Sequence, residues 1–143
     1  MNYELLILNN AIRMKKTANI LTKELELIAM RSYDTTYWRD GTMGQIQAIA
    51  DISEKIDECN AFCTAVKKAL LIVPKTYRAL LVTVYFKYCD KKDLAIKYKV
   101  SMSTVYRKIR YAREAFKRAL ESIGCDEQWF SANYGHYNFI CGE

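Results

Sequence analysis

The chain has 143 residues, 51% of them apolar, so it can bury one core as a single domain or as a small domain with a helical arm. Five glycines and one proline predict an all-α chain, because both residue types interrupt helices. No apolar run approaches the roughly 20 residues of a membrane-spanning helix, and no basic segment precedes the apolar residues 5–8. We therefore expect a cytoplasmic protein without membrane contacts.

The formal net charge of +6 is distributed unevenly along the chain. Residues 1–73 contain nine basic and nine acidic side chains, residues 74–121 contain thirteen and four, and residues 122–143 contain none and three. The three net charges are therefore 0, +9 and −3. A positive excess confined to one segment is typical of a surface that binds a polyanion.

Two long helices are predicted in the first segment, residues 1–73. Apolar residues repeat at steps of three and four over 3–31 and again over 45–72. The first seam is Ile7, Ala11, Met14, Ala18, Leu21, Leu25 and Ile28, and the second is Ile49, Ile52, Ile56, Cys59, Cys63, Val66, Leu70 and Val73. Neither helix can bury its seam alone, which leaves two alternatives: a long antiparallel two-helix arm, or a homodimer through residues 1–73.

A three-helix module is predicted over residues 74–124. Pro74 favours the start of a helix that continues to about residue 88. Asp90 is the predicted N-cap of a short second helix, and Ser101 is the predicted N-cap of a long third one. Lys99 stands in the turn between these two helices, where it must accept a positive φ at some cost or form a different turn.

The third helix of this module, residues 102–121, has two contrasting faces. Its apolar residues fall within about 100° of one another, and they are Val105, Ile109, Ala112, Phe116, Ala119, Leu120 and Ile123. The other side carries Ser103, Arg107, Arg110, Arg113, Lys117 and Arg118, with Lys108 at its flank. A solvated face usually mixes charges of both signs, whereas here six basic residues oppose only Glu114 and Glu121. We expect the apolar face in the core and the basic face on a polyanion.

The second and third helices of the module have the features of a helix-turn-helix. Ala95 is small enough for a close helix crossing, Val100 closes the turn, and Val105 is the apolar anchor beneath the capped end of the third helix. Such a helix presents its first turns to base edges in the major groove.

Residues 71–121 resemble region four of bacterial sigma factors, a three-helix module that binds the promoter −35 element. The shared features are Pro74, an aromatic residue at the end of the next helix, Leu94-Ala95, Val100-Ser101, Ser103-Thr104-Val105 and a basic helix with Ala112. A long helical arm before this module also resembles small phage late-transcription regulators of the RinA/ArpU type. The resemblance covers residues 71–121, about a third of the chain.

This resemblance implies a sequence-specific transcriptional regulator, phage- or mobile-element-related, that reads duplex DNA with residues 102–121. It assigns base contacts to Ser103, Thr104, Tyr106, Arg107 and Arg110. Charge and position alone assign phosphate contacts to Lys91, Lys92, Lys108, Arg113 and Lys117. Arg107 is the best candidate for a guanine contact, because a guanidinium fork can bridge O6 and N7.

Two other functions are also compatible with the sequence. A small-terminase-like component of phage DNA packaging also joins a helix-turn-helix to an oligomerising helical part, and a large subunit ring would favour it. A protein-interaction module acting on RNA polymerase would instead lack salt-sensitive duplex binding.

We expect neither an enzyme nor a cofactor or metal site, because the chain has one histidine, no glycine-rich phosphate loop and no clustered carboxylates. Cys59 and Cys63 are predicted to be core residues. The aromatic C-terminal tail, residues 125–143, either folds over the core or hangs loose.

Overall fold

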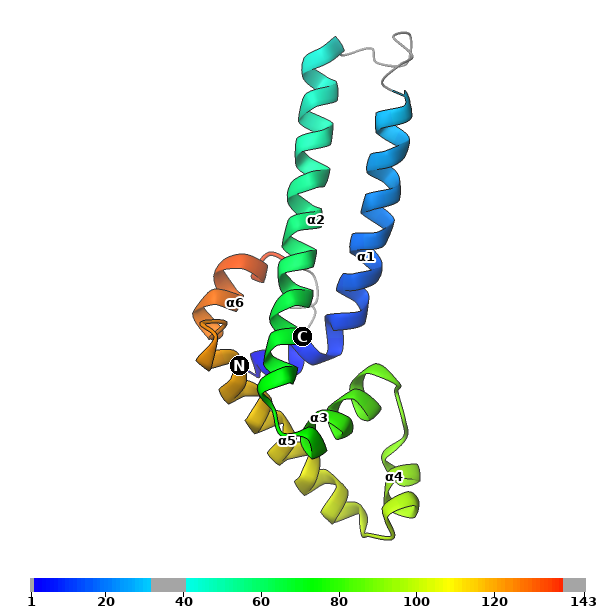
Figure 1. Ribbon diagram of the computed structural model, residues 1–143, viewed down its shortest axis with the longest axis vertical. Coiled ribbons are helices and arrows are strands. Elements are labelled where there is room, and N and C mark those ends of the chain that lie inside the picture. The colour runs from blue at the N-terminus through cyan, green and yellow to red at the C-terminus, as the bar shows by residue number, and fades with distance from the viewer. Residues whose placement is uncertain (1, 32–40, 138–143) are drawn as a thin grey trace. The chain divides into compact units, whose positions relative to one another are not determined.

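The computed structural model describes residues 2–31 and 41–137, which form helices and no strand (Figure 1). The predicted all-α class is therefore confirmed for this part of the chain. The helices are α1 (Tyr3–Arg31), α2 (Gly41–Ile72), α3 (Lys75–Leu81), the π-helical turn η1 (Val82–Phe86), α4 (Lys91–Tyr98), α5 (Met102–Ser122) and α6 (Glu127–Tyr134). None of these helices has both the length and the apolar character needed to cross a membrane.

The predicted helix caps are present. The Asp90 carboxylate accepts a hydrogen bond from the Lys92 backbone N–H at 3.2 Å, and the Ser101 hydroxyl accepts one from the Thr104 backbone N–H at 3.2 Å. Lys99 takes the first of its two predicted alternatives, a left-handed conformation with φ 55°. Asp90 and Lys99 therefore mark the start and the end of α4, and Ser101 marks the start of α5.

The helix predicted from Pro74 to about residue 88 is not a uniform α-helix. After Leu81 it widens, and the Lys87 N–H donates to the Val82 carbonyl at 3.0 Å, five residues back. The Thr83 hydroxyl donates to the Ala79 carbonyl at 2.8 Å, an arrangement that commonly bends helices. Sequence periodicity does not reveal this change, because the apolar residues continue through it.

The chain divides into two compact units, Met1–Ala11 with Thr64–Glu143 and Ile12–Cys63. The first turns of α1 and the end of α2 therefore belong to the same unit as α3–α6. This division groups the residues differently from the predicted arm, module and tail, because both α1 and α2 contribute to each unit. An antiparallel arm and a homodimer through residues 1–73 stay predictions.

The unit Ile12–Cys63 contains parts of α1 and α2, and its apolar seams are the less exposed positions. The buried seam residues are Met14, Ala18 and Cys59, and the half-buried ones are Leu21, Leu25, Ile28, Ile49, Ile52, Ile56 and Cys63. Ile20, Leu27 and Met30, which lie off the seam, are more than half exposed. The spacing thus predicted the shielded side of each helix.

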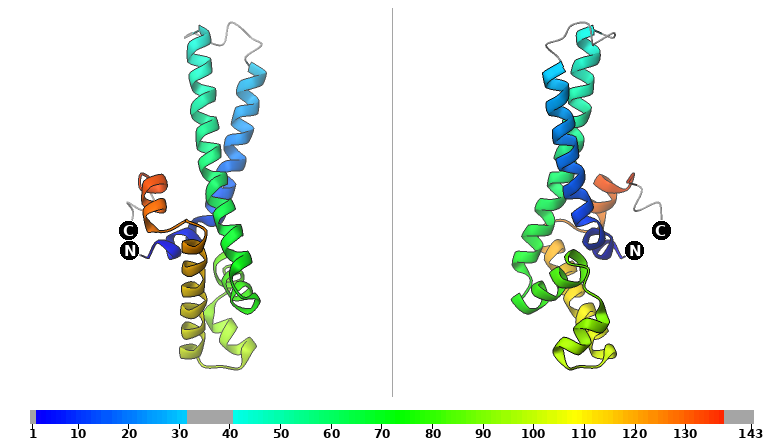
Figure 2. Two further views of the ribbon diagram at one scale, coloured as in Figure 1. Left: turned by 60° about the vertical axis from the view of Figure 1, so that its left-hand side comes forward. Right: turned by 90° about the vertical axis from the view of Figure 1, so that its right-hand side faces the viewer.

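The core of the other unit is built around α5. Both α3 and α4 pack on this helix, as the two views of Figure 2 show. Its buried residues are Val105, Ile109, Ala112, Phe116, Ala119 and Leu120, whereas Ile123 lies past the end of the helix and is half-buried. Leu94 joins Val105 and Ile109 in one cluster, against which Ala95 and Val100 pack.

A helix that the sequence analysis did not predict, α6, covers another part of this core. The Asp126 carboxylate accepts a hydrogen bond from the Trp129 backbone N–H at 2.9 Å and so caps the helix. Phe130 and Tyr134 are buried, and the ring of Phe130 lies 6.2 Å from that of Tyr3. Residues 125–137 of the predicted tail therefore fold over the core, and residues 138–143 lie outside the described part.

Candidate nucleic-acid interface

The start of α5 is held by a cap that also uses one of the predicted base-reading residues. The Thr104 backbone N–H donates to the Ser101 hydroxyl, and the two hydroxyl groups are themselves hydrogen-bonded at 2.9 Å. Thr104 is half-buried, whereas its neighbour Ser103 is exposed. The hydroxyl of Thr104 thus stabilises the helix start, and Ser103 is the better placed of the two for an outside ligand.

A concavity of about 400 Å³ lies along the basic face of α5 and reaches the first turn of α4. Six of the ten predicted site residues line it: Lys91, Ser103, Tyr106, Arg107, Arg110 and Arg113. Tyr85 and Ile109 complete its wall. The fold therefore gathers four cations around a serine hydroxyl and two tyrosine rings, a combination that suits phosphates together with base edges.

Lys91 is placed in this concavity by the local structure of α4. The Asp90 cap begins α4 immediately before it, and the Lys91 ammonium lies 4.9 Å from the centroid of the Tyr106 ring. This distance is within the range of a cation–π contact. The contact fixes the position of Lys91 over α5 and covers one face of a ring that is otherwise half exposed.

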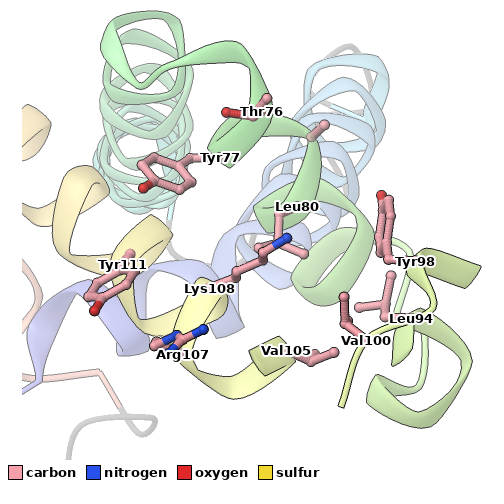
Figure 3. Close-up of a pocket in the computed structure, with 11 residues that line it drawn as sticks. Thr76, Tyr77, Leu80, Leu94, Tyr98, Val100, Val105, Arg107, Lys108 and Tyr111 are labelled. Atoms are coloured by element: carbon pink, nitrogen blue, oxygen red, sulfur yellow. The ribbon is translucent and has the colours of Figure 1, made fainter. Parts of the chain in front are cut away.

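The opposite flank of α5 borders a groove of about 720 Å³, shown in Figure 3. It is lined by Thr76, Tyr77, Ala79 and Leu80 of α3, Leu94 and Tyr98 of α4, Val100 of the turn, and Val105, Arg107, Lys108 and Tyr111 of α5. Tyr77 and Tyr111 lie toward one end of the groove and Tyr98 toward the other (Figure 3). Lys108 lines this groove and not the concavity, whereas Arg107 lines both the groove and the concavity.

The tyrosines of this groove were missed by sequence reasoning. Tyr77 and Tyr98 lie on different helices from Tyr111, so no periodicity connects them. Half-buried Tyr77 and exposed Tyr98 and Tyr111 line one groove only once α3, α4 and α5 are packed together. The sequence could show the abundance of tyrosine, eleven in the chain, but not this placement.

The remaining predicted phosphate residues are placed differently from one another. Lys92 is exposed in the first turn of α4 and lines neither hollow. Lys117 is half-buried, with its ammonium 5.9 Å from the centroid of the Tyr3 ring. Arg113 lines the concavity, but its Nε also lies 3.8 Å from the Glu4 carboxylate. The first turn of α1 therefore touches the far end of the basic face.

Two polar atoms of this first turn are buried without a hydrogen-bond partner among the described residues, the Tyr3 hydroxyl and Oε2 of Glu4. Burial raises the pKa of Tyr3 well above its usual value near 10, and the negative charges of Glu121, Glu4, Asp126 and Glu127 act in the same direction. Tyr3 is therefore a neutral phenol at physiological pH. Burial likewise raises the pKa of the Cys125 thiol, which favours its protonated form.

In the described ranges, no three His, Cys, Asp or Glu side chains are grouped so that they could hold a metal ion. No protein-family model, curated protein or solved structure matches the chain. The arrangement of cations, hydroxyl and ring on α4 and α5 is therefore the basis for a functional proposal.

Proposed function

We propose that the protein is a sequence-specific transcriptional regulator that binds duplex DNA, with α4 and α5 as a helix-turn-helix and α5 in the major groove. The observation that carries this proposal is the concavity in which Lys91, Arg107, Arg110 and Arg113 surround Ser103 and Tyr106. The resemblance to sigma region four supports the same function. The phage or mobile-element context rests only on the resemblance of the arm and module to small phage late-transcription regulators.

The placement of the side chains refines the proposed roles. Ser103, Tyr106, Arg107 and Arg110 are exposed on the first half of α5 and are assigned to base edges. We assign Lys91, Lys92 and Lys108 to phosphates on either side of the helix. Thr104 is assigned to the helix cap, because its hydroxyl is already hydrogen-bonded there.

Fluorescence anisotropy with labelled duplex DNA between 50 and 200 mM salt tests the nucleic-acid part of the proposal. If Lys91, Lys92 and Lys108 each neutralise one phosphate and displace one counterion, log K falls against log salt with a slope of about −2.7, or about 40-fold over this range. The double variant Arg107→Ala/Arg110→Ala should bind more weakly.

A matched control for that variant is Lys15→Ala/Lys16→Ala, which removes the same charge from exposed positions of the other compact unit. We expect it to bind like the wild type. A slope near zero for the wild-type protein, or equal losses for the two double variants, would contradict the proposed interface.

Selection of bound duplexes from a random pool tests sequence specificity. Arg107→Ala should cost about 1–3 kcal/mol on the preferred duplex and relax the preference at one base pair. Two symmetric half-sites, together with a dimeric native mass, would support the homodimer proposed for residues 1–73. A large ring in native mass spectrometry would favour a packaging component instead.

One observation favours a second candidate function, a protein-interaction module. The groove of Figure 3 combines an aliphatic floor of Leu80, Leu94 and Val100 with Arg107 and Lys108 along one side. This chemistry suits an acidic amphipathic helix, and RNA polymerase is the partner that the resemblance suggests. The variant Tyr77→Ala/Tyr111→Ala should then lose regulation while it retains duplex binding.

A further inference from the structure

The first turn of α1 brings a carboxylate to the basic face of α5 within one compact unit. Glu4 is only 6% exposed and its neighbour Tyr3 only 1%. Oε1 of Glu4 lies 3.8 Å from Nε of Arg113, and the Tyr3 ring lies beneath the Lys117 ammonium. The far end of the basic face is thus already occupied by residues of the same chain.

The contact between Glu4 and Arg113 is an incomplete ion pair. Its separation of 3.8 Å exceeds the roughly 2.7–2.9 Å of a charge-assisted hydrogen bond. Oε2 of Glu4 is buried and has no hydrogen-bond partner in the described part of the chain. A buried carboxylate with so few partners is a costly arrangement, whereas a DNA phosphate can offer a guanidinium two hydrogen bonds.

We infer that Glu4 competes with DNA phosphate for Arg113, so that the first turn of α1 limits how much of the basic face binds DNA. This inference rests on the proposed function, because the concavity must first bind a polyanion. In the unbound protein, Glu4 neutralises the charge of Arg113, so this side chain gives little counterion release on binding. The carboxylate also repels a phosphate that approaches Arg113.

The variant Glu4→Gln tests this competition, because it keeps the shape of the side chain and removes its charge. Arg113 then becomes available to one more phosphate. We expect duplex affinity to rise by about 3- to 10-fold at 100 mM salt and the salt slope to steepen by about 0.9. In the double variant Glu4→Gln/Arg113→Ala this gain should be absent, because the gain acts through Arg113.

The matched control is Asp57→Asn, which changes the net charge equally at an exposed position of the other compact unit. It should bind duplex DNA like the wild type. If Glu4→Gln and Asp57→Asn behave alike while the wild type shows the expected salt dependence, the inference is wrong and the proposed function stands. If the wild type does not bind duplex DNA in a salt-dependent manner, the proposed function fails, and the inference fails with it.

A second measurement on the wild-type protein does not depend on the folding of a variant. The ¹⁵N resonance of Arg113 Nε should shift when duplex DNA is added, because the guanidinium exchanges the Glu4 carboxylate for a phosphate. The Nε resonance of Arg78, which is bonded to backbone carbonyls away from the concavity, should stay in place. An unchanged Arg113 resonance at saturating duplex would overturn the competition.

Discussion

Arg78 connects α3 to the end of α2 through three hydrogen bonds. Its Nε donates to the Leu70 carbonyl at 2.6 Å, and its Nη2 donates to the carbonyls of Leu71 and Val73 at 3.1 Å each. Carbonyls at the end of a helix have no partner within the helix, and a cation there is also favoured by the helix dipole. Arg78→Ala should therefore lower the free energy of unfolding of this compact unit.

We expect Arg78→Ala to lower that free energy by about 2–3 kcal/mol, because a hydrogen bond to a charged group contributes about 1.5–3 kcal/mol and the more exposed Leu71 carbonyl regains water. Arg78→Lys should lower the free energy of unfolding by about half as much, since an ammonium keeps the charge but not the planar fork of the guanidinium. With a urea m-value of about 1.5–2 kcal/mol/M, the Arg78→Ala midpoint falls by about 1–2 M.

Urea unfolding can be followed by the fluorescence of Trp129 in a Trp38→Phe background, since these are the two tryptophans of the chain. Lys75→Ala, an exposed position on the same helix, is the matched control and should leave the midpoint unchanged. Equal midpoints for the Arg78→Ala and Lys75→Ala variants would show that these hydrogen bonds do not stabilise the unit.

Three further predictions concern the core and the helix ends. Phe116→Ala should cost about 3–5 kcal/mol of unfolding free energy in urea, because this fully buried ring leaves a cavity. Lys99→Gly should raise the thermal midpoint, with a gain of about 0.5–1 kcal/mol, because a glycine accepts the observed φ of 55° without strain. Above about pH 10 the wild type should lose stability relative to Tyr3→Phe. Burial raises the pKa of Tyr3 in the folded protein, whereas the pKa of a tyrosine in the unfolded chain is about 10. The unfolded chain therefore loses this proton first as the pH rises, which favours unfolding. Urea midpoints of the two proteins at about pH 9 and pH 11 measure this difference, and an equal change for both would contradict it.

The helices could be predicted because their signals are local. Asp90 and Ser101 cap α4 and α5 through bonds to residues two and three positions away, and the apolar spacing of α5 matches its buried face. The π-helical turn η1 has no such signal, because its apolar residues keep a helix-like spacing. The sequence did not predict α6 for another reason. The segment around it is aromatic and contains glycines, so Asp126 was not recognised as a helix N-cap.

The candidate site could be predicted only in part. The sequence indicated which residues of α5 face outward, because periodicity gives the angle around a helix. It could not indicate that Lys91 would meet Tyr106, or that Glu4 would meet Arg113, because these pairs depend on how separate helices pack. The assignment of Thr104 to base reading had a similar weakness, since its hydroxyl serves the Ser101 cap.

The packing divides one basic helix face into parts with different electrostatic behaviour. Among the described residues, Arg107 and Arg110 line the concavity without an ion-paired carboxylate such as the one beside Arg113, while Lys117 lies over the buried Tyr3 ring. If Arg113 and Lys117 also released counterions, the expected salt slope would be about −4.5 and not about −2.7. The charge count alone predicts the steeper value, and the packing of α1 on α5 predicts the shallower one. A measured salt slope therefore separates a basic face that is fully available from one whose far end is held by its own chain.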